Sequence, residues 1–113
     1  MAKILILNGP NLDKLGTREP EIYGSLTISE IEQLCIERAK DLGLEIDFRQ
    51  SNSETDLIEW LHLAATEKLP VIINPAAFTH YSVAIRDAAA LLTTPLIEVH
   101  ISNPIAREEF RHT

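Results

Sequence analysis

Short apolar runs alternate with amphipathic helical segments along this sequence, and this alternation constrains the fold more than any other feature. The apolar runs have strand length, whereas the segments between them repeat apolar residues at the spacing of a helix buried on one side. Strands that alternate with helices form right-handed crossovers, which predicts an α/β fold with a parallel sheet. The expected strands are 4–8, 44–49, 70–74 and 95–100, and the helices are 27–42, one that begins after Ser53, and 82–92.

Local signals support these boundaries. Thr27 and Glu30 have the spacing of a capping box at the start of the first helix, and Gly43 is placed to end it. Ser53 is placed to cap the second helix. The apolar face of the first helix contains Leu34, Cys35 and Leu42. We interpret Cys35 as a core residue rather than a reactive thiol.

Composition limits the class of protein. The chain has 113 residues, enough for a single domain, 1–113, and 45% of them are hydrophobic, as in a globular fold. A net charge of −7 argues against a nucleic-acid partner, and no apolar run approaches membrane-spanning length. The single cysteine excludes an internal disulfide and suits a reducing compartment, so we expect a cytoplasmic protein.

A long segment without helical or strand periodicity, 8–24, follows the first strand. Loops of this length in small domains are usually functional or disordered, and an ordinary solvated loop is the alternative. The segment carries Asn11, Arg18 and Tyr23, which supply an amide, a fixed cation and a phenol. These side chains make it the first candidate for a functional segment.

Polar residues also cluster where the predicted strands end, at Asn8, Gln50, Asn74 and His100. Ligands of open α/β sheets bind outside the carboxyl ends of the strands. Arg18 lies in the long segment, and Arg107 and Arg111 lie four apart near the end of the sequence. A locally cationic pocket in an acidic protein would suit a small anionic substrate. We therefore expect one crevice that brings together the long loop and Asn11, Asn74, His80, His100 and Ser102.

The chemistry available to this crevice is acid–base catalysis. No metal-ligand spacing or glycine-rich phosphate loop is present, and no lysine is placed for a Schiff base. Glu98 shares a strand face with His100 and is placed to orient its imidazole, although a neighbouring cation is an alternative partner. Tyr23 would act as a base if a cation such as Arg18 favoured its anion.

Five motifs, taken together, identify a resemblance to the type II 3-dehydroquinate dehydratases. They run in the family's order along essentially the whole chain: N-G-P-N-L at 8–12, G-T-R-E-P-E-I-Y-G at 16–24, Q-S-N at 50–52, T-H-Y-S-V-A-I-R-D at 79–87 and E-V-H-I-S-N at 98–103. The resemblance implies a flavodoxin-like, doubly wound parallel sheet in a three-layer α/β/α arrangement. It also implies conversion of 3-dehydroquinate to 3-dehydroshikimate and water, in the shikimate pathway, without a metal or cofactor.

The resemblance further implies a role for individual residues. Tyr23 matches the base that removes the C2 proton, and Arg18 matches the lid arginine that lowers its pKa. Asn11 matches the residue that holds a water at the enolate, and His100 matches the acid that protonates the leaving C1 hydroxyl, with Glu98 as its orienting partner. The residues that match substrate-gripping positions are Asn74, His80, Ile101, Ser102 and Arg111, and Asp87 matches one that reaches a neighbouring subunit in dodecamers of four trimers.

The sequence also departs from the family pattern. Ala76 stands where the family usually has glycine, and the family continues beyond the R-H-T at 111–113 with another strand and helix. We therefore expect a longer functional polypeptide, or a partner chain that covers the edge of the last strand. A non-catalytic flavodoxin-like module that binds a small anion is the alternative function.

Overall fold

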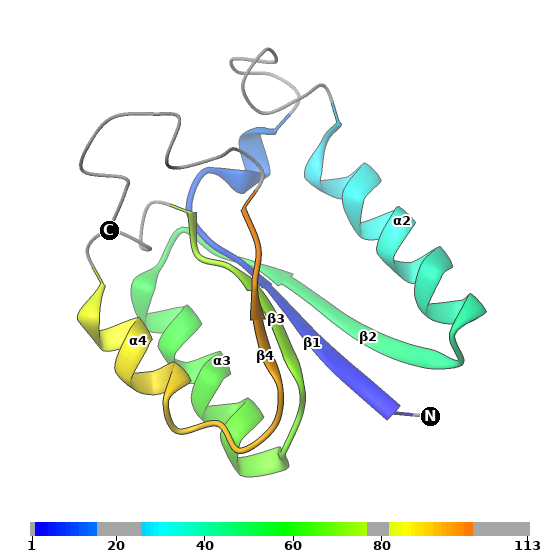
Figure 1. Ribbon diagram of the computed structural model, residues 1–113. Helices are drawn as coiled ribbons and strands as arrows, with labels where there is room; N and C mark the ends of the chain where they lie inside the picture. The colour runs from blue at the N-terminus through cyan, green and yellow to red at the C-terminus, as the bar shows by residue number, and fades with distance from the viewer. Residues whose placement is uncertain (1, 16–25, 77–81, 101–113) are drawn as a thin grey trace.

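The computed structural model describes residues 2–15, 26–76 and 82–100. Its centre is a four-stranded sheet in the order β2-β1-β3-β4, and every pair of neighbouring strands is parallel (Figure 1). The predicted parallel sheet is therefore confirmed, with small changes at the strand ends. The strands are β1 (Ala2–Asn8), β2 (Leu44–Gln50), β3 (Val71–Asn74) and β4 (Leu96–Glu98).

Helices cover both faces of this sheet, so the predicted doubly wound, three-layer α/β/α arrangement is confirmed. Helix α2 lies on one side, and α3 and α4 lie together on the other (Figure 1). A short 3-10 helix, η1, follows β1 at the carboxyl end of the sheet. The helices are η1 (Leu12–Lys14), α2 (Ile28–Asp41), α3 (Glu54–Glu67) and α4 (Val83–Ala89).

The predicted helix caps are present. The Thr27 side chain accepts a hydrogen bond from the backbone N–H of Glu30, whose carboxylate accepts one from the backbone N–H of Thr27. Gly43 follows α2 with a φ of 70°, a left-handed conformation that glycine adopts without strain. Ser53 caps α3 by accepting a hydrogen bond from the backbone N–H of Asp56.

Helix α4 is shorter than predicted and ends at Ala89, not at residue 92. The backbone N–H groups of Leu91 and Leu92 donate to the backbone oxygens of Ala88 and Ala89 over 3.1 Å, so the chain leaves the helix through turns whose hydrogen bonds join residues three apart. Pro95 follows soon after, and a proline disfavours helical geometry in the residue before it. Helical periodicity detected the helix but did not fix where it ends.

The hydrophobic core lies between the sheet and the α3–α4 layer. Leu5, Leu7, Val71 and Ile73 point to this side from the two central strands and are at most 4% exposed. They pack with Leu57, Leu61, Ala64, Ile85 and Ala88 of the two helices. Complete burial of this cluster makes it the main source of hydrophobic stabilisation in the described part of the chain.

The α2 face is less completely covered. The main packing of α2 is against β2 at the sheet edge, and Leu34 and Leu42 on its apolar stripe are 53% and 56% exposed. The opposite edge strand, β4, is exposed at all three of its residues. Among the described helices, none has the length and apolar character needed to cross a membrane.

Candidate active site

Two buried asparagines mark the carboxyl ends of the central strands. Asn8 ends β1 and Asn74 ends β3, the two are register partners, and they are 7% and 5% exposed. From this point β1 leads to α2 on one face of the sheet, whereas β3 leads to α4 on the other. Such a topological switch point is where a parallel α/β sheet opens a crevice for a ligand.

Hydrogen bonds hold both asparagines in place. The Asn8 side chain donates through Nδ2 to the backbone oxygen of Arg49 over 2.9 Å. The Asn74 side chain accepts from the backbone N–H of Ala76 over 3.1 Å, and its backbone oxygen accepts from Gly9 over 2.8 Å. A Cβ atom on Gly9 would lie 2.5 Å from the Pro75 oxygen, so the two strand-end loops approach closely only because this residue is glycine.

An open hollow of about 170 Å³ lies beside the asparagines, between the sheet and α2. Except for Asn8 and Asn74, its walls are aliphatic, aromatic or thiol groups. The walls alone could not satisfy a substrate with several hydroxyl groups, because each buried hydroxyl needs a hydrogen-bond partner. The lining residues are Ile6, Asn8, Ile28, Ile31, Cys35, Phe48, Ile72, Asn74 and Val99.

Asn11 lies at the same end of the sheet, in the loop after β1. Its backbone is left-handed, with a φ of 67°, and its N–H donates to Oδ1 of Asn52 over 2.9 Å. Gln50 donates through Nε2 to the same oxygen over 3.2 Å. The sequence pattern identified Asn11 as a site residue but gave no role to Asn52. Asn52 is the last residue of the Q-S-N motif at 50–52, so that motif could have identified it.

His100 and Glu98 lie at the end of β4, next to the end of β3. The backbone N–H of Val99 donates to Ile73 over 2.8 Å, which places His100 beyond the sheet on the side of Asn74. Glu98 Oε1 is 3.7 Å from His100 Nε2, an ion-pair contact that is longer than a hydrogen bond. In the described part of the chain, His100 is therefore the side chain that lies within ion-pair distance of Glu98.

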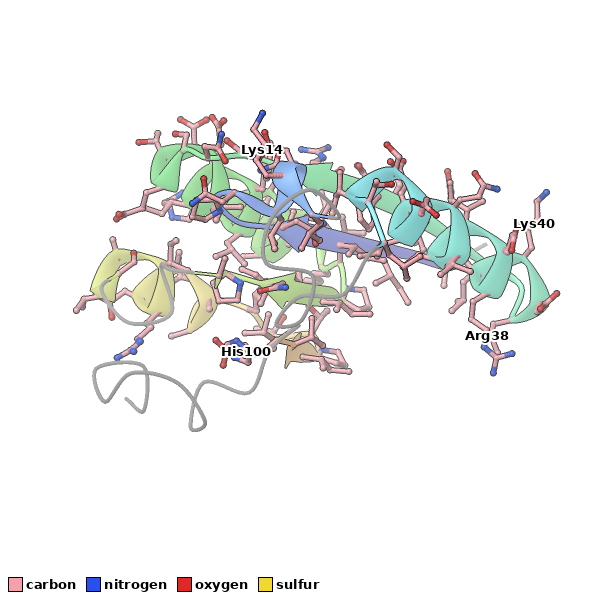
Figure 2. All side chains as sticks on the ribbon, turned by 90° about the horizontal axis from the view of Figure 1, so that it is seen from above. Lys14, Arg38, Lys40 and His100 are labelled. Carbon is pink, nitrogen blue, oxygen red and sulfur yellow. The ribbon has the colours of Figure 1, made fainter. Side chains whose placement is uncertain are left out.

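The lysines are not placed for covalent catalysis. Lys3, Lys14, Lys40 and Lys68 are all exposed, whereas a Schiff-base lysine needs a desolvated environment. Lys14 belongs to η1 rather than to an irregular loop, and Figure 2 shows it on the opposite side of the molecule from His100. Lys40 lies near the far end of α2 in the same view.

Two groups in this region have shifted pKa values: the Cys35 thiol, which lines the hollow, and the Asp47 carboxyl on β2. Burial, with a smaller contribution from Glu32, raises the pKa of the Cys35 thiol, which agrees with an unreactive thiol. Cys35 is half-buried and lines the hollow, however, rather than lying in the buried core as predicted. The hydrogen bonds from Arg49 lower the pKa of Asp47 on β2. The described residues contain no group of three or more histidine, cysteine or carboxylate side chains arranged to hold a metal ion.

The remaining predicted site residues fall into two groups. Asp87 is exposed on α4, and its side chain has no hydrogen bond or ion pair with another described residue. The others lie outside the described residues, and so does the predicted cationic pocket formed by the arginines of the long loop and the final segment. These residues are Arg18, Tyr23, His80, Ile101, Ser102 and Arg111.

Comparisons with known proteins agree on one family. Residues 2–113 match the model of the family described as dehydroquinase class II. The chain is 60% identical over 109 residues to the 3-dehydroquinate dehydratase of Maricaulis maris, a match that spans 96% of this chain and 75% of that protein. It is 54% identical over 110 residues to the enzyme of the same name from Salinispora tropica, spanning 97% of this chain and 77% of that one.

Solved structures point to the same family. The type II dehydroquinase from Propionibacterium acnes superposes with a TM-score of 0.96 at 53% identity, covering 99% of this chain and 77% of that one. The type II dehydroquinase from Butyrivibrio crossotus superposes with a TM-score of 0.94 at 45% identity, covering 98% and 78%. At these identities the likeness extends beyond the fold to the family.

Proposed function

The chain belongs to the class II dehydroquinase family, and we propose from this membership that it is a 3-dehydroquinate dehydratase, a lyase of the shikimate pathway. The observation that carries the proposal is the 60% identity with the Maricaulis maris enzyme over 96% of the chain. The reaction removes a proton from C2 of 3-dehydroquinate and the hydroxyl from C1. It yields 3-dehydroshikimate, in which the new C1–C2 double bond is conjugated with the C3 ketone, and one molecule of water.

We assign the proton transfers to residues at the carboxyl end of the sheet. Tyr23, as its anion, takes the C2 proton, and the electron pair moves onto the ketone oxygen to form an enolate. Arg18 favours the tyrosine anion, because a nearby cation lowers the pKa of a phenol. Collapse of the enolate expels the C1 hydroxyl, which leaves as water after His100 protonates it.

Support for the assignment of His100 comes from its contact with Glu98. A carboxylate 3.7 Å from Nε2 limits the orientations of the imidazole, which suits a general acid that must point at the leaving hydroxyl. Support for Asn11 comes from its fixed backbone at the end of β1, where it would hold a water that donates to the enolate oxygen.

Substrate binding is assigned to a second group of residues. Asn74 is buried at the switch point, which suits an amide that contacts a hydroxyl group of the substrate. Arg111 would hold the substrate carboxylate, because a guanidinium and a carboxylate form two parallel hydrogen bonds. We assign further contacts to the substrate to His80, Ile101 and Ser102.

Assembly and location are also part of the proposal. Asp87 is exposed on α4, so its side chain is accessible to a neighbouring subunit. We propose a homododecamer built as a tetramer of trimers, located in the cytoplasm. Analytical ultracentrifugation of the purified chain tests the assembly, and a monomer at assay concentrations would contradict it.

The direct test is enone formation from 3-dehydroquinate, followed by ultraviolet absorbance. The wild-type chain should produce the enone, before and after dialysis against a chelator, because no step of the proposal uses a metal. His100→Ala, which removes the proposed acid, serves as the comparison. Calorimetric binding of 3-dehydroquinate to the wild-type chain without turnover would instead favour the non-catalytic anion-binding module.

A further inference from the structure

Two turns that lie 41 residues apart in the sequence are joined by amide side chains. Oδ1 of Asn52 accepts two hydrogen bonds, from the Asn11 backbone over 2.9 Å and from Gln50 Nε2 over 3.2 Å. Gln50 Nε2 also donates to the backbone oxygen of Gly9 over 3.1 Å. Because Gly9 offers only a carbonyl there, the nitrogen of Gln50 must face it, and this fixes the orientation of both amides.

The residue held in this way has an uncommon backbone conformation. Asn11 has a φ of 67° and a ψ of −1°, in the left-handed region where the Cβ atom of most L-residues is strained. Asparagine tolerates this region better than most residues, and hydrogen bonds to neighbouring groups select it here. The Asn11 N–H donates to Oδ1 of Asn52, and the Asn11 backbone oxygen accepts from the N–H of Lys14, the last residue of η1, over 3.0 Å.

The turn that carries Asn52 is itself fixed at both ends. Ser51 Oγ donates to Asp56 over 2.7 Å and accepts from the Ser53 N–H over 2.9 Å, which ties the turn to the start of α3. The Ser51 N–H donates to the Asn8 oxygen over 3.0 Å, which ties it to the end of β1. Asn52 is therefore a fixed point against which the loop after β1 is held.

We propose that Asn52 and Gln50 are positioning residues for the dehydration, which hold the Asn11 backbone so that its side chain is presented correctly to the substrate. The inference rests on the proposed function, in which Asn11 holds the water at the enolate oxygen. Catalytic groups must be held close to their productive geometry, and a misplacement of about 1 Å can cost about 100-fold in rate. Neither residue needs to touch the substrate for this role.

The roles of the two amides differ, and this gives a sharp set of variants. Asn52→Ala removes the acceptor and should lower kcat about 10- to 100-fold. Asn52→Asp keeps an acceptor oxygen and should retain more of the wild-type kcat than Asn52→Ala. Gln50→Glu replaces the donor with an acceptor that faces the oxygens of Gly9 and Asn52. This variant should therefore have a lower kcat than the wild type, although glutamate is nearly isosteric with glutamine. The control is Gln33→Ala, which removes an exposed amide from α2.

A double-mutant cycle separates positioning from a general loss of structure. Asn11→Gly removes the side chain and tolerates a positive φ. If Asn52 acts through Asn11, adding Asn52→Ala to Asn11→Gly should change kcat by less than about twofold, because the residues act as a unit. If the two substitutions multiply their separate effects on kcat, the proposal is wrong, and so it is if Asn52→Ala retains the wild-type kcat.

Amide hydrogen exchange measured by NMR tests the clamp without any activity. The Asn11 N–H should exchange faster in Asn52→Ala than in the wild type or Gln33→Ala, because it has lost its acceptor. Unchanged exchange at Asn11 contradicts the proposal. A wild-type chain that forms no enone overturns the proposed function instead, and the exchange of Asn11 then still decides whether Asn52 holds the loop.

Discussion

The carboxylate of Glu98 contacts the imidazole of His100 from the same strand end, with 3.7 Å between Oε1 and Nε2. The side chain of Glu98 is 51% exposed and that of His100 is 28% exposed, so water reaches this pair of side chains. Exposed pairs are worth about 0–1 kcal/mol, because solvent screens the attraction. If Glu98 acts by orienting His100, the proposed acid, we therefore expect it to supply only a small part of the catalytic effect.

Glu98→Gln should accordingly lower kcat for enone formation by roughly fivefold or less, the equivalent of about 1 kcal/mol. His100→Ala should lower it about 10² to 10⁴-fold, the range of general acid catalysis. Steady-state kinetics on both variants checks the ratio of the two losses in kcat. Equal losses in the two variants would mean that Glu98 acts in the reaction itself rather than through His100.

Ala76 has a φ of 53°, a left-handed conformation in which glycine is free of the Cβ strain. Ala76→Gly should therefore raise the free energy of unfolding by up to about 1 kcal/mol, measured by urea denaturation. Ala65→Gly on α3 is the matched control and should lower it, because glycine destabilises helices. A decrease for Ala76→Gly would show that the methyl group contributes packing that outweighs the strain.

The ion pair between Asp47 and Arg49 on β2 predicts a pH dependence of stability. The pKa of Asp47 is lowered mainly by its hydrogen bonds to Arg49, which lie at 3.0 and 2.8 Å. Its carboxylate therefore stabilises the fold at pH values above the ordinary pKa of aspartate. This contribution is lost as the pH falls through the lower pKa that Asp47 has in the folded state. Asp47→Asn should cost about 0.2–1 kcal/mol at neutral pH and progressively less in acid.

Urea denaturation at several pH values checks this expectation, since urea leaves charges unscreened. A double-mutant cycle with Arg49→Gln isolates the pair from the contact that Arg49 makes with the Trp60 ring, whose centroid lies 5.4 Å away. If the cost of Asp47→Asn were the same at pH 7 and below the folded-state pKa, the pair would not be its source.

Local sequence patterns predicted the local structure well. The capping box of Thr27 and Glu30 depends on residues three apart, so the sequence contains all the information needed. The same holds for Gly43 after α2 and Ser53 before α3. The order of strands and helices predicted the parallel sheet, because crossover handedness leaves few other arrangements.

Features that depend on tertiary contacts were predicted less well. Periodicity placed Leu34 and Leu42 on one apolar stripe of α2, but it did not reveal that both are more than half exposed. The bond between Asn11 and Asn52 joins residues 41 positions apart, and only the register of β1 with β2 brings them together. The strand-end rule located Asn74 and His100 correctly at one edge, because it depends only on strand direction.

Tyr23 is the proposed base that removes the C2 proton, and kcat of Tyr23→Phe is the measurement that decides whether it has this role. Tyr81→Phe is the matched control, since Tyr81 is the only other tyrosine of the chain. At saturating 3-dehydroquinate, Tyr23→Phe should lower kcat by about 10² to 10⁴-fold with little change in substrate affinity, whereas Tyr81→Phe should stay near the wild type. A Tyr23→Phe variant that forms the enone at the wild-type rate would contradict the proposed mechanism.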